Sequence, residues 1–211
     1  MKNTTHFYSL KPQWQRSFAD GINAELIDDK IIVIPEAIGT GHTYFIEVAP
    51  GISVLFSDYT LTSPIRMSKL TSEEEFYIFD YNLTEFGDLD DEINDAINLD
   101  LTILNNQVEN AYEPAVNQKT FGFSLFIDTV MMQKFINEMP HAEFLNNKLN
   151  NSNKPHKDYI DSNSLILIFS LKEKSIFDVS FEEYLKGISF KLLANFLNRN
   201  ADLVPAKEYM L

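Results

Sequence analysis

The feature that most constrains the fold is a series of short segments rich in β-branched and aromatic residues between about residues 24 and 127. Turn signals such as Pro50 and Gly51 separate these segments, and no long helical pattern interrupts them. Because a parallel sheet needs crossover helices, the pattern predicts an antiparallel arrangement. The predicted strands cover residues 24–34, 44–48, 52–60, 76–83, 99–104 and 121–127.

Several of these segments carry apolar residues on both faces. Ile52, Val54 and Phe56 share one face of their strand, while Leu55 and Tyr59 share the other. A strand that is apolar on both sides is typical of a sandwich or barrel whose outer face is also partly covered. The 17 Phe and 9 Tyr supply ample material for such a core.

The second half of the chain shows helical patterns. Asp128 is a predicted cap for a helix that ends before Pro140, and Asp161 for a short apolar helix, although a buried strand is an alternative there. Residues 146–158 are predicted to form a loop or a poorly ordered linker. The final helix has a capping box of Ser180 and Glu183. One continuous apolar stripe then follows, consisting of Phe181, Leu185, Ile188, Leu192 and Phe196.

The predicted fold class is therefore α+β and mainly β, with a β-barrel over residues 1–128 and a helical region over residues 129–211. The formal charge of −14 disfavours direct binding to nucleic acid or to an anionic membrane. The chain has no cysteine, no signal peptide pattern and no apolar segment of membrane-spanning length. We expect a soluble, cytoplasmic protein.

Gly39 and Gly41 follow an apolar run, as in a phosphate-binding loop, but a strand pattern comes next where a helix would be needed. We expect these glycines to form a corner between strands. His42 has no second histidine at ligand spacing, so no metal and no cofactor is predicted. The acidic run from Asp88 lacks the glycine and the glutamate of a calcium loop. No nucleophile motif is present, which favours binding over catalysis.

The stretch IPEAIGTGHTYFIEVAPGISVLFSDYTL, with FYIFDYNLTE downstream, resembles the N-terminal sensor domain of AraC-type bacterial transcriptional regulators. The segments FGFSLFIDTVMMQKFI and FEEYLKGISFKLLANFLNR resemble the last barrel strand with its first linker helix and the long linker helix of that group. The resemblance implies a cupin-like β-barrel or jelly roll that captures a small-molecule effector, followed by helices that form a homodimer. It also implies a DNA-binding half, for which no room is left before Leu211. The chain is then either a piece of a longer regulator, which we favour, or a stand-alone sensor.

Two sets of residues are candidates for these roles. The barrel pocket is expected to use Tyr44, Tyr59, Tyr77, Phe79 and Tyr81, with core packing as the alternative for each. The dimer interface is expected on the final helix through Tyr184, Leu185, Ile188, Leu192 and Leu193, with packing against its own barrel as the alternative. Two rival functions stay open: a cupin-type metalloenzyme, either an isomerase or a dioxygenase, and a purely structural barrel. Lacking a His-x-His pair, the barrel should not hold the metal of the enzymatic cupins.

Overall fold

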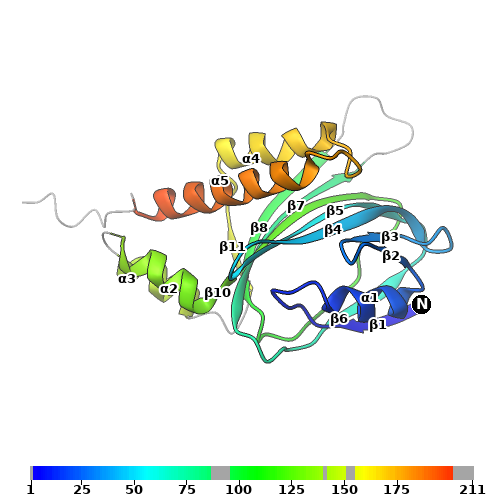
Figure 1. Cartoon of the computed structure of the whole chain (residues 1–211), viewed down its shortest axis with the longest axis horizontal. Helices are drawn as coiled ribbons and strands as arrows, with labels where there is room; N and C mark the ends of the chain where they lie inside the picture. The colour runs from blue at the N-terminus through cyan, green and yellow to red at the C-terminus, as the bar shows by residue number, and fades with distance from the viewer. Residues whose placement is uncertain (1, 87–95, 140–141, 151–154, 202–211) are drawn as a thin grey trace, which may run out of the picture.

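A large antiparallel sheet dominates the fold, which is α+β and mainly β (Figure 1). The computed structural model describes residues 2–86, 96–139, 142–150 and 155–201. The large sheet has eight strands in the order β11-β8-β7-β10-β5-β4-β3-β2, and a smaller sheet has three strands in the order β1-β6-β9. The large sheet consists of β2 (Glu25–Ile27), β3 (Ile31–Val33), β4 (Gly39–Ala49), β5 (Ile52–Leu61), β7 (Phe76–Phe86), β8 (Ala96–Asn105), β10 (Lys119–Asp128) and β11 (His156–Asp158). The small sheet consists of β1 (Lys2–His6), β6 (Ile65–Lys69) and β9 (Asn110–Tyr112).

Helices cover both faces of the large sheet. On one face lie the C-terminal helices, and on the other lie α1 and the small sheet (Figure 1). None of the described helices combines the length and the apolar character that crossing a membrane requires. The helical elements are α1 (Trp14–Ile22), α2 (Thr129–Asn137), α3 (Ala142–Asn150), α4 (Ser162–Phe169), a 3-10 turn (Ser170–Glu173) and α5 (Phe181–Ala201).

Most predicted strands and the helix starts are confirmed, with shifted ends. The single strand predicted over residues 24–34 is instead a hairpin, in which β2 pairs antiparallel with β3. The Asp128 carboxylate accepts hydrogen bonds from the backbone N–H groups of Val130 and Met131, and α2 begins there. The Asp161 carboxylate accepts one from the N–H of Ser164 at the start of α4, so the alternative of a buried strand is wrong. Such caps satisfy N–H groups that have no partner inside the helix.

Two further local expectations are wrong, and one helix was not predicted. Residues 146–158 are not simply a loop, because α3 extends to Asn150 and β11 pairs with β8. No element was predicted for the N-terminal segment, where Trp14, Phe18 and Ile22 make one apolar face of α1 at a spacing of four. The corner predicted at Gly39 and Gly41 is instead the start of β4, already paired with β5.

The two glycines have a steric reason inside that strand. A Cβ on Gly39 would lie 2.3 Å from the Thr60 carbonyl oxygen, and one on Gly41 would lie 2.2 Å from the Asp58 carbonyl oxygen. Gly41 also has a φ of 109°, a conformation that side chains disfavour. Both positions therefore allow β4 to approach β5 closely.

The large sheet separates two hydrophobic cores. Phe56 and Phe121 belong to the core under α5, where Phe56 meets Phe181 edge to face at 5.6 Å between ring centroids. Phe45 and Phe126 belong to the opposite core, beneath Trp14 of α1. The expected apolar stripe of α5 is confirmed, because all of its members are buried against the sheet: Phe181, Leu185, Ile188, Leu192 and Phe196.

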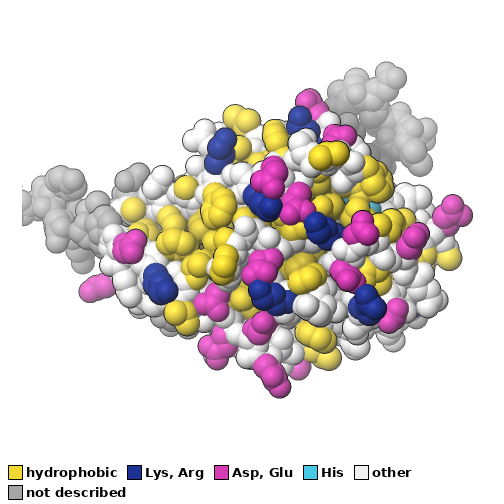
Figure 2. All heavy atoms as spheres, in the orientation of Figure 1, with side chains coloured by type: hydrophobic (Ala, Val, Ile, Leu, Met, Phe, Trp, Pro, Cys, Tyr) yellow, Lys and Arg dark blue, Asp and Glu magenta, His cyan; other side chains and the backbone are white. Residues whose placement is uncertain are grey.

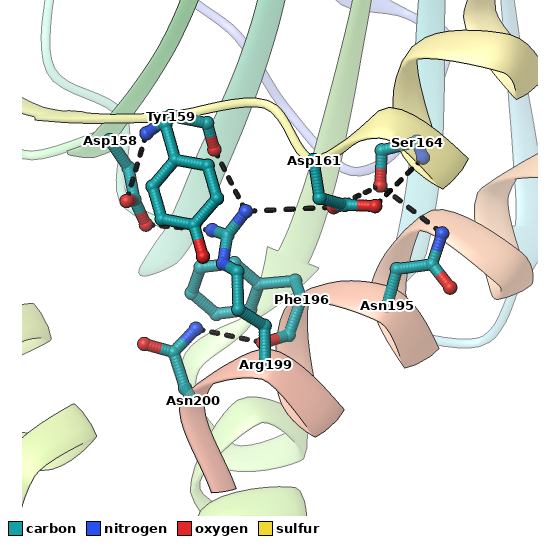
Figure 3. A network of polar contacts seen from close by, with 8 residues as sticks. All are labelled: Asp158, Tyr159, Asp161, Ser164, Asn195, Phe196, Arg199 and Asn200. Carbon is teal, nitrogen blue, oxygen red and sulfur yellow. Dashed lines mark hydrogen bonds and ion pairs between the residues drawn. The ribbon is translucent and has the colours of Figure 1, made fainter. Parts of the chain in front are cut away.

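Arg199, near the end of α5, binds the last residue of β11 and the segment that follows it (Figure 3). One guanidinium nitrogen donates to Asp158 at 2.8 Å, and another donates to the Tyr159 carbonyl oxygen at 2.8 Å and lies 3.6 Å from Asp161. The guanidinium also stacks 4.3 Å from the centroid of the Tyr159 ring. Asn195 extends the contact by donating to Ser164 of α4 at 3.2 Å.

Candidate functional site

The candidate site is a partly open cavity of about 270 Å³ on the face of the large sheet that is turned away from α5. Strands β5, β7, β8 and β10 form its floor, and Tyr8, β6 and β9 contribute the opposite wall. Inward-facing side chains near one end of the floor are apolar and belong to the core beneath α1. Farther along the same strands, the inward positions become polar, with Ser57, Asp80, Asn82, Thr102, Thr120 and Ser124.

Asp80 lies in the middle of this polar region. It stands opposite Ser124 in the register of β7 and β10, and the Ser124 hydroxyl donates to Asp80 Oδ1 at 2.7 Å. Burial raises the pKa of Asp80, and the bond from Ser124 offsets only part of that effect. Among the ion pairs found in the described residues, none involves Asp80. Within the described residues, the Asp80 carboxylate of the cavity therefore has no cation in an ion pair with it.

Three tyrosines line the same pocket as Asp80. Tyr59 comes from β5, Tyr112 from β9, and Tyr8 from the segment after β1. Burial raises the pKa of Tyr59 to about 12, with a smaller contribution in the same direction from the Asp80 charge. Burial and the Asp80 charge also raise the pKa of Tyr8, which forms a hydrogen bond with Tyr112. The phenols of Tyr8 and Tyr59 are therefore protonated at neutral pH and can donate hydrogen bonds.

A second cavity of about 50 Å³ adjoins the first and shares the three tyrosines with it. His6, Trp14 and Thr43 also line it, and their buried polar atoms have no protein partner within hydrogen-bonding distance. Burial, and to a lesser degree the charge of Lys69, lowers the pKa of His6 to about 4. This part of the interior therefore offers neutral polar groups, which suits water or an uncharged part of a ligand.

Of the predicted pocket residues, Tyr59 lines both cavities. Tyr44, Tyr77, Phe79 and Tyr81 lie in the opposite core and do not line the larger cavity. Tyr44 packs against Phe181, and Phe79 packs against Phe196, both from α5. All four residues therefore fit the alternative of core packing. In β7, alternate residues face opposite sides of the sheet, so Tyr77, Phe79 and Tyr81 face away from the cavity.

The predictions from sequence missed Asp80 and Asn82 in β7, Ser124 in β10, and Tyr8 and Tyr112 in the opposite wall. A usable signal existed for the first two. Within FYIFDYNL, polar residues replace apolar ones at alternate positions while the other face stays apolar. Such a change marks the point where one face of a strand leaves the packed core. Tyr8 and Tyr112 had no comparable signal.

The predicted dimer residues also pack within the chain. Leu185, Ile188, Leu192 and Leu193 are buried against the large sheet, which corresponds to the alternative of packing on its own barrel. Tyr184 keeps 37% of its surface exposed. Figure 2 shows apolar side chains interspersed with acidic and basic ones over α4 and α5. The larger exposed apolar side chains of these helices and of the turn between them are Ile166, Phe177, Val179 and Phe190.

No group of three or more His, Asp or Glu side chains suited to a metal ion occurs in the part of the chain that the structure describes. His42 lies in β4 opposite Asp58, with its ring 6.3 Å from that of Phe56. The acidic run over residues 88–95 lies outside the described residues.

Protein-family models, curated proteins and solved structures were compared with this chain, and none of them matches it. The cavity and the residues around it are therefore the main basis for a functional assignment.

Replacing Asp80 with Asn is expected to stabilise the protein without ligand by about 1 kcal/mol near neutral pH. The folded state raises the pKa of Asp80 above its ordinary value of 3.8, so folding penalises the ionised carboxylate. In the wild type, the contribution of Asp80 to the free energy of unfolding is lowest at neutral pH. It rises as the pH falls towards the ordinary pKa of 3.8. Urea unfolding near pH 7 and near pH 4 measures the difference, which should shrink at the lower pH.

Asp58→Asn is the matched control for this prediction. Asp58 belongs to neighbouring β5, faces the other side of the sheet and pairs with Lys119 at 3.3 Å. Its replacement should change the free energy of unfolding by no more than about 0.5 kcal/mol. If Asp80→Asn clearly destabilised the protein at neutral pH, the ionised Asp80 carboxylate would not be a cost to the folded state.

Proposed function

We propose that this chain binds a small molecule in its larger cavity and acts as the effector-binding domain of an AraC-type transcriptional regulator. The observation that carries the proposal is the polar lining of the 270 Å³ cavity in an otherwise apolar interior. Among the described residues that line the cavities, the unpartnered buried polar atoms are Asn82 Oδ1 in the larger cavity and, in the smaller one, the ring nitrogens of His6, Trp14 Nε1 and Thr43 Oγ1. Such groups cost about 1–3 kcal/mol each, so a purely structural barrel gains nothing from them. A ligand that supplies the missing partners accounts for their presence.

The resemblance to AraC-type sensors supports the regulatory part of the proposal. Ile34, Ile38 and Leu61, from the motif that carries the resemblance, line the smaller cavity. A cupin-like barrel, which the resemblance implies, would enclose a ligand between its walls in the same manner. Regulation of transcription would need two helix-turn-helix units in the same reading frame beyond residue 211.

The same proposal assigns the C-terminal helices to signal relay. Pro155 lines the larger cavity, and Asp158 of the following strand β11 binds Arg199 at the end of α5. A ligand that favours one position of β11 would therefore bias the position of α5. Dimerisation stays part of the proposal, and the exposed side chains Ile166 and Phe190 offer the contact surface for a second copy.

A cavity-filling substitution tests ligand binding directly. Gly122 lines the cavity, and a Cβ there would meet only ordinary contacts at 3.8 Å, so Gly122→Leu is expected to fill the space while keeping the fold. Gly187→Leu is the matched control, because Gly187 is exposed on α5 with no atom within 4 Å of an added Cβ. Each protein is mixed with a small-molecule extract of bacterial cells and desalted, and the retained compounds are measured by mass spectrometry.

Wild type and Gly187→Leu should retain the same compound, and Gly122→Leu should lose it. Equal retention by all three proteins, or no retained compound at all, would contradict binding in the cavity. Metal analysis of the same purified protein addresses the alternative of a cupin-type metalloenzyme, which requires a stoichiometric transition metal.

A further inference from the structure

We propose that the ligand of the larger cavity is a small organic ammonium ion, held by the Asp80 carboxylate and surrounded by Tyr8, Tyr59 and Tyr112. This inference rests on the proposed function, because it names the chemical class of the ligand at the same site. It follows from the charge of the cavity, from the aromatic groups near that charge and from the size of the space.

The charge argument begins with Asp80. Its described hydrogen bond, from Ser124, reaches Oδ1 and leaves Oδ2 for another donor. Asp80 is half-buried, and a carboxylate withdrawn from water is costly to the extent that it lacks a cation and hydrogen bonds. A protonated amine supplies the charge and up to three donors, whereas a neutral hydroxyl supplies only a donor.

One cation, Lys69, also lines this cavity. Lys69 is buried, and its ammonium donates to the Asn106 carbonyl oxygen at 2.7 Å. No other Lys or Arg contributes to the described lining. The Lys69 charge is not among the causes that shift the pKa of Asp80, so it does not neutralise that carboxylate. An anionic ligand beside Asp80 would meet an unneutralised like charge, which disfavours carboxylates and phosphates at that position.

The tyrosines provide the second element of ammonium recognition. Tyr8, Tyr59 and Tyr112 line the same pocket as Asp80, so they border the space that a ligand of this carboxylate would occupy. The Asp80 charge contributes to the raised pKa of Tyr8 and of Tyr59. Tyr112 keeps 39% of its surface exposed. Aromatic faces attract cations, and several rings around one position form the usual cage for alkylated ammonium groups.

The size of the cavity limits the ligand. Pockets for small molecules have volumes of about 300–1,000 Å³, and the 270 Å³ of this cavity lies just below that range. That space suits an amine of few heavy atoms. Ethanolamine-like, choline-like and arylalkylamine ligands are of suitable size.

Two pairs of probes separate charge from shape. Choline is compared with 3,3-dimethylbutan-1-ol, its neutral counterpart, and protonated 2-phenylethylamine is compared with 2-phenylethanol. Calorimetry measures binding to wild type, Asp80→Asn, Gly122→Leu and the control Asp58→Asn. At least one ammonium probe should bind wild type and Asp58→Asn at least about tenfold more tightly than its neutral counterpart, which equals about 1.4 kcal/mol.

Asp80→Asn should remove that preference, and Gly122→Leu should abolish binding. The proposal is overturned if neither ammonium probe binds, if the neutral counterparts bind equally well, or if Asp80→Asn retains the preference. A compound from the cell extract that is uncharged, yet lost in Gly122→Leu, would refute the ammonium class and leave the proposed function standing. Absence of any retained compound would count against the proposed function itself.

Discussion

Gly41→Ala is expected to lower the free energy of unfolding by about 4 kcal/mol, the largest effect of any single methyl group considered for this protein. Gly41 has a φ of 109°, and its added Cβ would lie 2.2 Å from the Asp58 carbonyl oxygen and 2.5 Å from the Tyr59 Cα. Both atoms belong to the backbone of β5, so no side-chain rotation relieves the clash. Because Tyr59 lines the cavity, displacement of β5 should also weaken ligand binding.

Gly187→Ala is the control with the opposite expected sign. Gly187 lies in α5, where an added Cβ meets nothing within 4 Å. Alanine favours helix over glycine by about 1 kcal/mol, so this variant should be more stable than wild type. Urea unfolding of the two variants measures both effects. A loss of less than about 1 kcal/mol in Gly41→Ala would mean that β4 and β5 can separate more easily than their packing indicates.

Arg199→Met is expected to lower the free energy of unfolding by about 3 kcal/mol. The Arg199 side chain is 11% exposed and that of Asp158 is 9% exposed, so the pair is largely withdrawn from water. Removing the guanidinium takes its positive charge and its hydrogen bonds away from Asp158, Asp161 and the Tyr159 carbonyl group. Methionine keeps much of the apolar stem, so the loss should reflect mainly the charge. Thermal and urea unfolding measure it.

Lys157→Met serves as the control for removing a cation. Lys157 is 75% exposed and lies 3.5 Å from Asp100, so its loss should cost no more than about 0.5 kcal/mol. Arg199→Lys should recover only part of the stability, because an ammonium cannot reproduce the fork of donors of a guanidinium. Comparable stability of Arg199→Met and Lys157→Met would show that the contacts of Arg199 are energetically minor.

The sequence allowed the strands and the final helix to be predicted because both depend on local periodicity. The alternation of Val54 and Phe56 with Leu55 defines the two faces of β5, and the spacing of Leu185 and Leu192 defines the buried side of α5. These patterns show which residues share a face. They do not show which face the helices cover and which face encloses a cavity.

That limit explains why most of the predicted pocket residues do not line the larger cavity. The prediction chose large aromatic residues of β7 as ligand-binding groups: Tyr77, Phe79 and Tyr81. These side chains pack under the C-terminal helices. Asp80 and Asn82, between and beyond them, face the cavity. Only a knowledge of what covers each face distinguishes the two sets.

The pairing of β1 with β6 has a consequence for the order of folding. The two strands run parallel, with Lys2 opposite Ile65, and β9 then adds to the far edge of β6. Strand β1 can therefore dock only after the hairpin of β4 and β5 and the following strand β6 have formed. Such long-range pairing slows folding, so Tyr8 reaches its position in the cavity wall late, and the cavity is complete only when the segment that contains β1 has docked.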